Sequence, residues 1–405
     1  MTISRPDPFE LVGTTIAGKY DVEEMVAHTA LSAVYRATHR VWQRRVAIKA
    51  FNAPSLSDEA RQQLLASFVD EGRLLMDLSE RCAAICQARD VSSLTTRRGD
   101  WVPYTVLEWL DGECLEVMLR RERAERGRPR RLKAVVELLN PIAEALAIAH
   151  ERGVVHRDVK PGNIFVLSGA AGEAVRTKLL DFGVAKVMRG AAAAPGAVVS
   201  QSFTPSYGAP EQFSSAYGTT GPWTDVFALG LIVVELLTGR EALQGDVVST
   251  LGAQSCDPDV RPTARRLGAK VTDEVEGVLE CALAVRFEDR FGNARELWSA
   301  LRDALAAELL EERLHAVQAP RGPWAAGDGP GGEGHPQAIE PVDSERGTEG
   351  EIHVEWDVPR ASAELAPAEA GSPRGSEIAL SSTIPIALSR RRSEAQPPQI
   401  TEKAT

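Results

Sequence analysis

The chain lacks an excess of basic residues. Its 405 residues include 46 Lys and Arg against 57 Asp and Glu, which gives a formal net charge of −11. Binding to the phosphate backbone of nucleic acids depends on a surplus of Lys and Arg, so this balance argues against nucleic acid as a general partner. Apolar residues make up 43% of the chain, enough to build at least one large core.

Long apolar runs are also missing. The most apolar stretch, residues 226–237, is interrupted by Glu235 and is too short to cross a bilayer, so it predicts a buried helix. No N-terminal segment combines basic residues with an apolar stretch, and the sequence therefore shows no signal peptide. Together these absences predict a cytoplasmic protein without a membrane span.

Cysteines are few, and their spacing does not match the usual zinc sites. They are Cys82, Cys86, Cys114, Cys256 and Cys281. A helix would place the thiols of Cys82 and Cys86 on one face, but no second pair of ligands follows nearby. We expect reduced thiols that behave as small apolar side chains rather than a metal site.

Patterned segments begin at Tyr20 and predict a small, mainly β region. Alternating apolar residues predict strands over residues 20–26, 32–38, 45–51 and 101–109, and an apolar spacing of 3.6 predicts a helix over residues 58–78. The segment Leu-Asp-Gly at 110–112 follows the last of these strands.

Helical patterns dominate the next two hundred residues, roughly. Helices are predicted over residues 114–126, 132–152, 223–237, 273–285 and 294–313, interrupted by a β-hairpin over 164–166 and 177–180. Beyond residue 316 the sequence is rich in Pro, Gly, Ala and Glu and poor in aromatics, which predicts a disordered tail.

Two short motifs carry most of the chemical information. Residues 156–163 read His-Arg-Asp-Val-Lys-Pro-Gly-Asn, and residues 181–183 read Asp-Phe-Gly. Together they supply a proton acceptor, a cation and two oxygen ligands for a metal, which are the groups that phosphoryl transfer requires. Either motif alone would be weak, but the two in this order are strong.

These motifs are the basis of a family resemblance: the chain is similar to the Hanks-type (eukaryotic-like) serine/threonine protein kinases of bacteria. Further family markers occur in the expected order, namely Val-Ala-Ile-Lys ending at Lys49, Glu71, Ala-Pro-Glu at 209–211, Asp225, Gly230 and Arg290. The sequences of residues 208–213 and 221–227 resemble the corresponding segments of kinases from myxobacteria.

The resemblance implies an α+β, bilobal protein-kinase-like fold. We expect a short polar extension over residues 1–18, a β-rich N-lobe with helix C over 19–110 and a larger, mainly helical C-lobe over 111–305. Residues 306–405 would be the end of a helix followed by the low-complexity tail.

The resemblance also implies roles for the motif residues in ATP-dependent transfer to Ser or Thr hydroxyls of proteins. Asp158 would accept the proton of the acceptor hydroxyl, and Lys160 would neutralise charge on the transferring group. Lys49 would hold the ATP phosphates and pair with Glu71. The metal ligands would be Asn163 and Asp181, for Mg²⁺ or alternatively Mn²⁺.

The adenine ring would lie between apolar side chains, next to a gatekeeper at Leu107. The residues that match the family's adenine-binding positions are Val34, Ala47, Phe165 and, through their backbone, Glu108 and Leu110. Two other positions would be structural. Asp225 would hold the catalytic loop, and Glu211 would pair with Arg290 beneath the activation segment.

One departure from the family is large. The loop that covers the phosphates should contain three glycines, but residues 27–32 read Ala-His-Thr-Ala-Leu-Ser. The small residues Ala27, Thr29 and Ser32 would leave a poorer backbone cradle, and the two hydroxyls are candidates for contacts to phosphate. An active kinase with weakened ATP affinity is the main interpretation, and a pseudokinase-like scaffold that binds nucleotide weakly is the alternative.

Regulation by phosphorylation is the family's usual pattern. Arg157 would bind a phosphate on the activation segment, residues 184–208. Thr204 matches the threonine that contacts the catalytic loop, and Ser200 and Ser202 are the hypothesised phosphorylation sites. The alternative is that these serines are ordinary polar loop residues.

Two further segments are candidate docking sites. The stretch 120–133 is rich in arginine and is either a solvated helix end and loop or a docking surface for an acidic substrate. In the tail, residues 351–358 alternate apolar and polar side chains, as does a strand that docks on a partner's sheet edge.

Overall fold

The computed structural model describes residues 7–29, 31–53, 57–125, 127–169, 176–182 and 203–318. The first part is a six-stranded antiparallel sheet with strand order β1-β2-β3-β4-β6-β5. Its strands are β1 (Thr15–Ile16), β2 (Tyr20–His28), β3 (Ser32–His39), β4 (Arg44–Phe51), β5 (Ala88–Thr95) and β6 (Trp101–Glu108). The strands predicted from alternation are confirmed to within about two residues, whereas β5 was missed.

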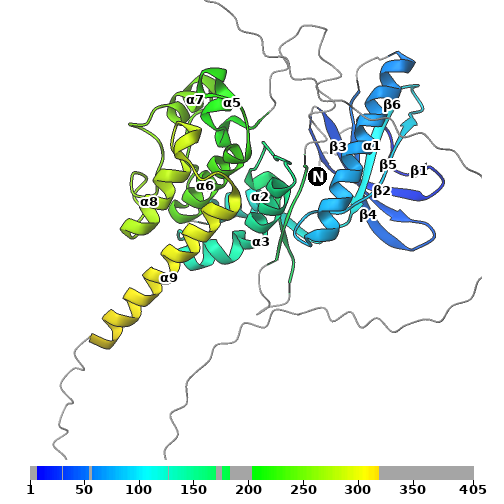
Figure 1. Cartoon of the computed structure of the whole chain (residues 1–405). Helices are drawn as coiled ribbons and strands as arrows, with labels where there is room; N and C mark the ends of the chain where they lie inside the picture. The colour runs from blue at the N-terminus through cyan, green and yellow to red at the C-terminus, as the bar shows by residue number, and fades with distance from the viewer. Residues whose placement is uncertain are drawn as a thin grey trace, which may run out of the picture. The chain divides into compact units, whose positions relative to one another are not determined.

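The two faces of this sheet have different covers. Along β3, Ala33, Tyr35 and Ala37 are buried in one core cluster, while the side chains between them face the other way. Helix α1 (Asp58–Arg81) packs against the sheet at β5, as Figure 1 shows. Its buried face includes Leu64, Phe68, Leu75 and Leu78, at the spacing that predicted the helix.

The N-terminal segment is less polar in its contacts than its composition suggested. Leu11 and Ile16 are buried in the same core cluster as Tyr35. Asp7 accepts a hydrogen bond of 2.5 Å from the Tyr35 hydroxyl and further bonds from the N–H groups of Phe9 and Val12. This segment therefore covers the face of the sheet from which the Tyr35 side chain emerges.

A short three-stranded sheet, β7-β8-β9, follows the larger one along the chain. Its strands are β7 (Gly112–Cys114), β8 (Ile164–Leu167) and β9 (Thr177–Leu179). Gly112 has φ +148°, and a Cβ there would lie 2.1 Å from the carbonyl oxygen of Val166. Only glycine lets β7 approach β8 this closely.

The remaining elements are helical and share the largest core cluster. They are α2 (Leu115–Ala124), α3 (Leu132–Glu151), α5 (Pro210–Phe213), α6 (Pro222–Thr238), α7 (Val248–Cys256), α8 (Asp273–Ala282) and α9 (Ala294–Gln318). The apolar run at 226–237 is buried throughout in α6, as predicted. In the described part of the chain, no helix is long and apolar enough to cross a membrane.

Helix α6 contacts α3, α8 and α9. Helix α9 packs along α3, α6 and α8, and its last turns extend beyond them in Figure 1.

All five cysteines are free thiols, with Cys82 and Cys86 buried. Burial raises the pKa of Cys86 to about 12, which fits the expectation of unreactive apolar thiols.

Candidate active site

The side chains of the 156–163 motif meet Thr204 around Asp158. Its Oδ1 accepts hydrogen bonds from the backbone N–H of Thr204 at 3.1 Å and from the Thr204 hydroxyl at 2.9 Å. Its Oδ2 lies 2.9 Å from the ammonium of Lys160, which also donates to the Thr204 hydroxyl at 2.7 Å. A carboxylate, an ammonium and a hydroxyl from two distant chain segments are therefore in direct contact.

Asn163 links this cluster to the strand that precedes Asp181. Its Nδ2 donates to the backbone carbonyl of Asp158 at 2.8 Å and to Asp158 Oδ2 at 3.3 Å. Its own carbonyl accepts the N–H of Leu180 at 2.8 Å. The predicted metal ligands Asn163 and Asp181 thus lie on backbone segments that are hydrogen-bonded to each other.

Lys49 and Asp181 form an ion pair, with 2.5 Å between Nζ and Oδ2. Burial works to raise the pKa of Asp181, but the positive charge of Lys49 outweighs it and holds the pKa below its ordinary value. Asp181 is therefore ionised at neutral pH. The sequence predicted a pair between Lys49 and Glu71. Glu71 lies half-buried on α1, and that pair stays a prediction.

Two residues of the motifs have left-handed backbones. Arg157 has φ +62° and Asp181 has φ +57°, in a region of backbone conformation that residues other than glycine seldom adopt. The surroundings hold both in place. The carbonyl of Arg157 accepts a hydrogen bond from Gln212 at 2.9 Å. Phe182, which follows Asp181, is buried with its ring centroid 4.9 Å from that of His156.

Asp225, fully buried near the start of α6, holds the catalytic loop. It accepts the backbone N–H groups of His156 at 2.8 Å and Arg157 at 2.6 Å, together with His150 Nε2 at 2.9 Å. Burial pushes its pKa upward, but the hydrogen bond from His150 and the nearby imidazoles hold the pKa below its ordinary value. The structural role predicted for Asp225 is confirmed by these contacts.

The predicted adenine-binding side chains share a sheet face with Lys49. In the antiparallel register Val34 lies opposite Lys49, and Ala47 lies opposite Leu107. Directly opposed residues point to the same side, as do alternate residues of one strand, so all four side chains emerge on one face. Phe165 is half-buried on β8, opposite Cys114 and Lys178.

The side chain of Glu108 has a function that sequence reasoning missed. Its Oε1 accepts the backbone N–H of Gln87 at 2.9 Å and the ammonium of Lys178 at 2.5 Å. Its backbone N–H donates to the Gln87 carbonyl at 3.0 Å, so this N–H is already used within the protein. Lys178 three residues before Asp181 was the available signal, but nothing local in the sequence pairs it with Glu108.

The loop without glycines closes on itself through Thr29. The N–H of Thr29 donates to the carbonyl of Ser32 at 2.7 Å. The Thr29 hydroxyl oxygen accepts the N–H groups of Leu31 and Ser32, each at 3.2 Å, and lies 3.3 Å from the Ser32 hydroxyl. The side chain therefore caps the turn in the way that Thr does in short turns.

Glu211 and Arg290 form the predicted ion pair, and the structure shows it to be bidentate, with both N–O distances at 3.0 Å and both side chains 0% exposed. Thr224 donates to the same carboxylate at 2.7 Å. The guanidinium also donates to the backbone carbonyls of Ala284 and Val285. The pair joins the end of the activation segment to the loop that precedes α9.

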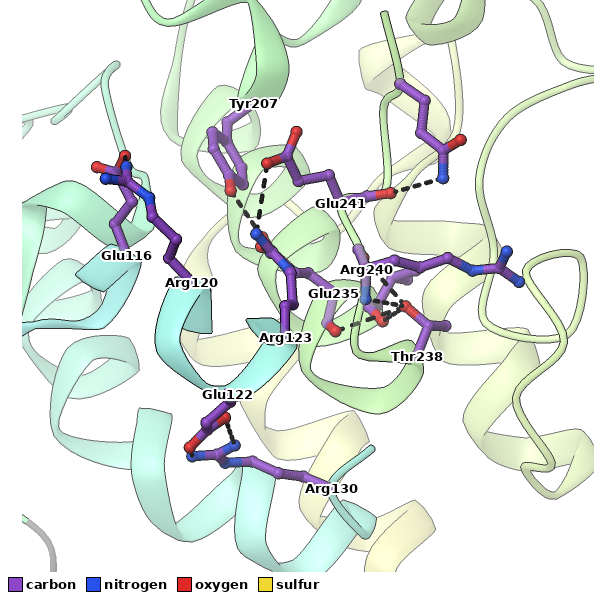
Figure 2. Close-up of polar contacts among 12 residues, drawn as sticks. Glu116, Arg120, Glu122, Arg123, Arg130, Tyr207, Glu235, Thr238, Arg240 and Glu241 are labelled. Carbon is purple, nitrogen blue, oxygen red and sulfur yellow. Dashed lines mark hydrogen bonds and ion pairs between the residues drawn. The ribbon is translucent and has the colours of Figure 1, made fainter. Parts of the chain in front are cut away.

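The arginine-rich stretch 120–133 is mostly engaged in ion pairs. Arg121 and Arg120 pair with Glu113 and Glu116, each at 2.7 Å, and these contacts lie at the surface. Arg130 binds Glu122 through both terminal nitrogens at 2.7 and 2.8 Å, and Arg123 reaches Glu235 and Glu241 (Figure 2). These contacts favour the interpretation as a helix end and loop over a docking surface for acidic proteins.

The structure brings most of the predicted catalytic and metal-binding residues together in two clusters. Asp158, Lys160, Asn163 and Thr204 form one contacting cluster, and Lys49 with Asp181 forms a second. Ser200 and Ser202 lie outside the described residues, as does the tail. Among the described residues, no group of three or more His, Cys, Asp and Glu side chains forms a metal site by itself.

The arrangement described above is that of a protein kinase, and comparisons agree. The sequence model of the protein kinase domain matches residues 20–308. The chain belongs to the protein kinase domain family, with a β-rich N-terminal sheet and a helical C-terminal part. It is a serine/threonine-protein kinase, an enzyme that uses ATP and a divalent metal and acts on proteins.

Two similar proteins are bacterial serine/threonine-protein kinases. The chain is 32% identical to serine/threonine-protein kinase PknL of Mycobacterium tuberculosis over 317 residues, covering 78% of this chain and 72% of PknL. It is 33% identical to Pkn1 of Myxococcus xanthus over 309 residues, covering 75% of this chain and 40% of Pkn1. The crystal structure of the PknI kinase domain of Mycobacterium tuberculosis aligns with a TM-score of 0.47 and 25% identity, over 72% of this chain and 98% of that one.

Proposed function

We propose that Asp158 is the general base that accepts the proton of the Ser or Thr hydroxyl during phosphoryl transfer. The observation that carries this assignment is the contact of Asp158 with both Lys160 and Thr204. The ammonium of Lys160 lies 2.9 Å from the carboxylate, where it would neutralise charge on the transferring group. Thr204 contacts the same carboxylate and so lies next to the acceptor.

We propose Mg²⁺ as the metal, with Mn²⁺ as an alternative, held by Asn163 and Asp181. Asp181 offers an ionised carboxylate, and Asn163 uses its Nδ2 toward Asp158, which leaves its Oδ1 for a cation. Mg²⁺ binds such sites through one or two protein oxygens together with substrate phosphates. When bound, it would neutralise charge on the phosphates. Lys49 would then turn from Asp181 toward the ATP phosphates and toward Glu71.

The adenine would lie against Val34, Ala47 and Phe165. Because the N–H of Glu108 is used by Gln87, the carbonyl of Glu108 and the backbone of Leu110 are the groups proposed for its hydrogen bonds. The phosphates would lie under residues 27–32, where Ala27, Thr29 and Ser32 replace glycines.

The assignment of Asp158 is tested by radiolabel transfer from ATP to a generic basic protein. Removing the base should lower kcat by about 10²–10⁴-fold, the usual contribution of general acid–base catalysis. Asp158→Asn is nearly isosteric, so its ATP-dependent thermal shift should stay close to that of the wild type. The control is Asp70→Asn, which neutralises a carboxylate that is 74% exposed on α1. Undiminished transfer by Asp158→Asn would exclude the assignment.

The same assay separates the enzyme from the alternative of a pseudokinase-like scaffold. A scaffold would show a thermal shift with ATP but no transfer above the level of Asp158→Asn. The presence of Lys49, Asp158, Lys160, Asn163 and Asp181 in contacting clusters supports the enzyme.

Phosphorylation of the activation segment is the proposed regulation. Arg157 would bind a phosphate on Ser200 or Ser202, and intact-mass analysis after incubation with ATP tests this.

The tail segment 351–358 would dock on a partner's sheet edge. A cytoplasmic location agrees with the use of ATP and with the free thiols, and the sequence supports no nucleic-acid partner. We also keep the proposed domain boundaries at residues 18, 110 and 305.

A further inference from the structure

A small pocket lies beside the proposed acceptor position. Its volume is about 190 Å³, and it is formed by α2, the catalytic loop, the segment after Thr204 and the end of α6. Lys160 and Thr204, which contact Asp158, are part of its wall. The pocket therefore lies where a residue next to the acceptor would reach, if the peptide presents its hydroxyl to Asp158.

Three of the residues that line the pocket are acidic. Glu235 from α6, Glu241 from the following loop and Glu116 from α2 line it. Glu235 is 1% exposed, and burial raises its pKa above the ordinary value even though Tyr207 and Arg123 act in the other direction. A buried carboxylate of this kind needs a cation or strong donors to stay charged.

The cation is supplied by the chain itself. Arg123 reaches from α2 into the pocket, where Nη2 donates to Glu235 and Nη1 lies 3.4 Å from Glu241 (Figure 2). The Tyr207 hydroxyl donates to the other oxygen of Glu235 at 2.7 Å. A guanidinium therefore already occupies the position where a basic side chain of a substrate would find its carboxylates.

The fit of Arg123 is incomplete. Its Nε is buried without a hydrogen-bond partner in the described structure, and its side chain is 32% exposed. A buried unpaired donor weakens the binding of the group that carries it. If Arg123 were absent, the carboxylates of the pocket would accept a guanidinium or ammonium from a substrate in its place.

We propose that Arg123 is a specificity-determining residue of this kinase. By occupying the acidic pocket beside the acceptor site, it excludes Lys and Arg side chains from that position of protein substrates. The wild-type enzyme then favours acceptor sequences with neutral residues there. This inference depends on the proposed role of Asp158, since that residue sets where the acceptor lies.

The test is a positional-scanning library of Ser and Thr peptides, phosphorylated by the purified full chain. The wild type should show no preference for Lys or Arg at the one position where Arg123→Ala gains it. Arg123→Ala should acquire a preference for Arg at one position, with kcat/KM at least about tenfold higher than for the matching Ala peptide. A charge-assisted hydrogen bond to a buried carboxylate contributes roughly this factor.

The matched control is the double variant Arg123→Ala/Glu235→Gln, which has the same open pocket without the buried charge. It should not acquire the preference. If Arg123→Ala does not fold by circular dichroism, Arg123→Lys serves instead. A single ammonium reaches one carboxylate and should release Glu241 for a weaker preference of the same sign.

Failures of the two proposals differ. If the wild type phosphorylates peptides and Asp158→Asn does so undiminished, the proposed catalytic assignment fails. If the wild type is active but already prefers Arg or Lys at the position where Arg123→Ala prefers Arg, the proposal for Arg123 is wrong. It is equally wrong if an active Arg123→Ala shows the wild-type preference, or if the double variant gains the same preference as the single one.

Discussion

At the scale of single residues, Thr29 is the most informative departure from the kinase pattern. Glycines in the phosphate-covering loop allow the backbone to approach phosphate and leave its N–H groups free to donate. Here the Thr29 hydroxyl accepts the N–H groups of Leu31 and Ser32, so the turn is closed by a side chain. The donors that would bind phosphate are engaged within the loop.

Replacing Thr29 should therefore change ATP binding in a defined direction. Thr29→Val keeps the shape but removes the acceptor oxygen, which frees the two N–H groups for phosphate. We expect KM for ATP to fall by about three- to tenfold, the value of one ordinary hydrogen bond. Steady-state kinetics at a fixed acceptor concentration measures this.

Ser32→Ala is the matched control for Thr29→Val. It removes a hydroxyl from the same loop but leaves the bonds from the backbone to Thr29 intact, and KM should change little. A KM for Thr29→Val that equals or exceeds that of the wild type would show that the capped turn favours ATP binding.

At the scale of elements, the ion pair between Glu108 and Lys178 joins the end of β6 to β9. Their side chains are 15% and 14% exposed, and β9 leads directly to Asp181. The pair therefore links the segment proposed to bind adenine to the strand that positions a proposed metal ligand. The pair is formed between residues 70 positions apart, which explains why no local pattern revealed it.

A double-mutant cycle tests the strength of this pair. Lys178→Met, Glu108→Gln and their combination should give a coupling free energy of about 1–3 kcal/mol in urea unfolding, since hydrogen bonds to charged groups are worth that much when largely buried. The matched control is the exposed pair Lys133–Glu137, at 3.9 Å with side chains 64% and 63% exposed. Its coupling should stay below about 0.5 kcal/mol. Equal couplings would contradict the assignment.

Among the elements that the sequence did not predict, β5 and α7 show the physical reasons. Strand β5 is an edge strand whose residues 92 and 93 are both serine, so its alternation is weak, and it forms through pairing with β6. Helix α7 begins without a side-chain cap and contains Gly252 and Ser255. Its position depends on tertiary contacts, such as the bond from Ser255 to the Gly208 carbonyl at 2.8 Å.

At the scale of the whole molecule, buried polar contacts connect parts of the chain that are far apart. His150 shows this. Its Nδ1 accepts the N–H of Ala294, so its Nε2 carries the proton that is donated to Asp225. Asp225 in turn holds the catalytic loop through His156 and Arg157. The start of α9 is thus connected by hydrogen bonds to the loop that carries the proposed base.

The pair between Glu211 and Arg290 should matter mainly for stability. Arg290→Ala would leave Glu211 buried without its cation, which typically costs about 3–5 kcal/mol. We expect a lower free energy of unfolding in urea. Arg286→Ala is the control, because Arg286 is 73% exposed and pairs only at the surface. Normal unfolding of Arg290→Ala would show that the bond between Glu211 and Thr224 is enough.

The family, the order of the longer elements and the cluster around Asp158 can be predicted from the amino-acid sequence, because these depend on short motifs and on apolar periodicity, which are local properties. The partners of Lys49, Glu108 and Arg123 could be found only from the three-dimensional arrangement. Each of these charges had several opposite charges available in the sequence. Which one it meets depends on how strands and helices distant in the chain come together, and no local pattern encodes that.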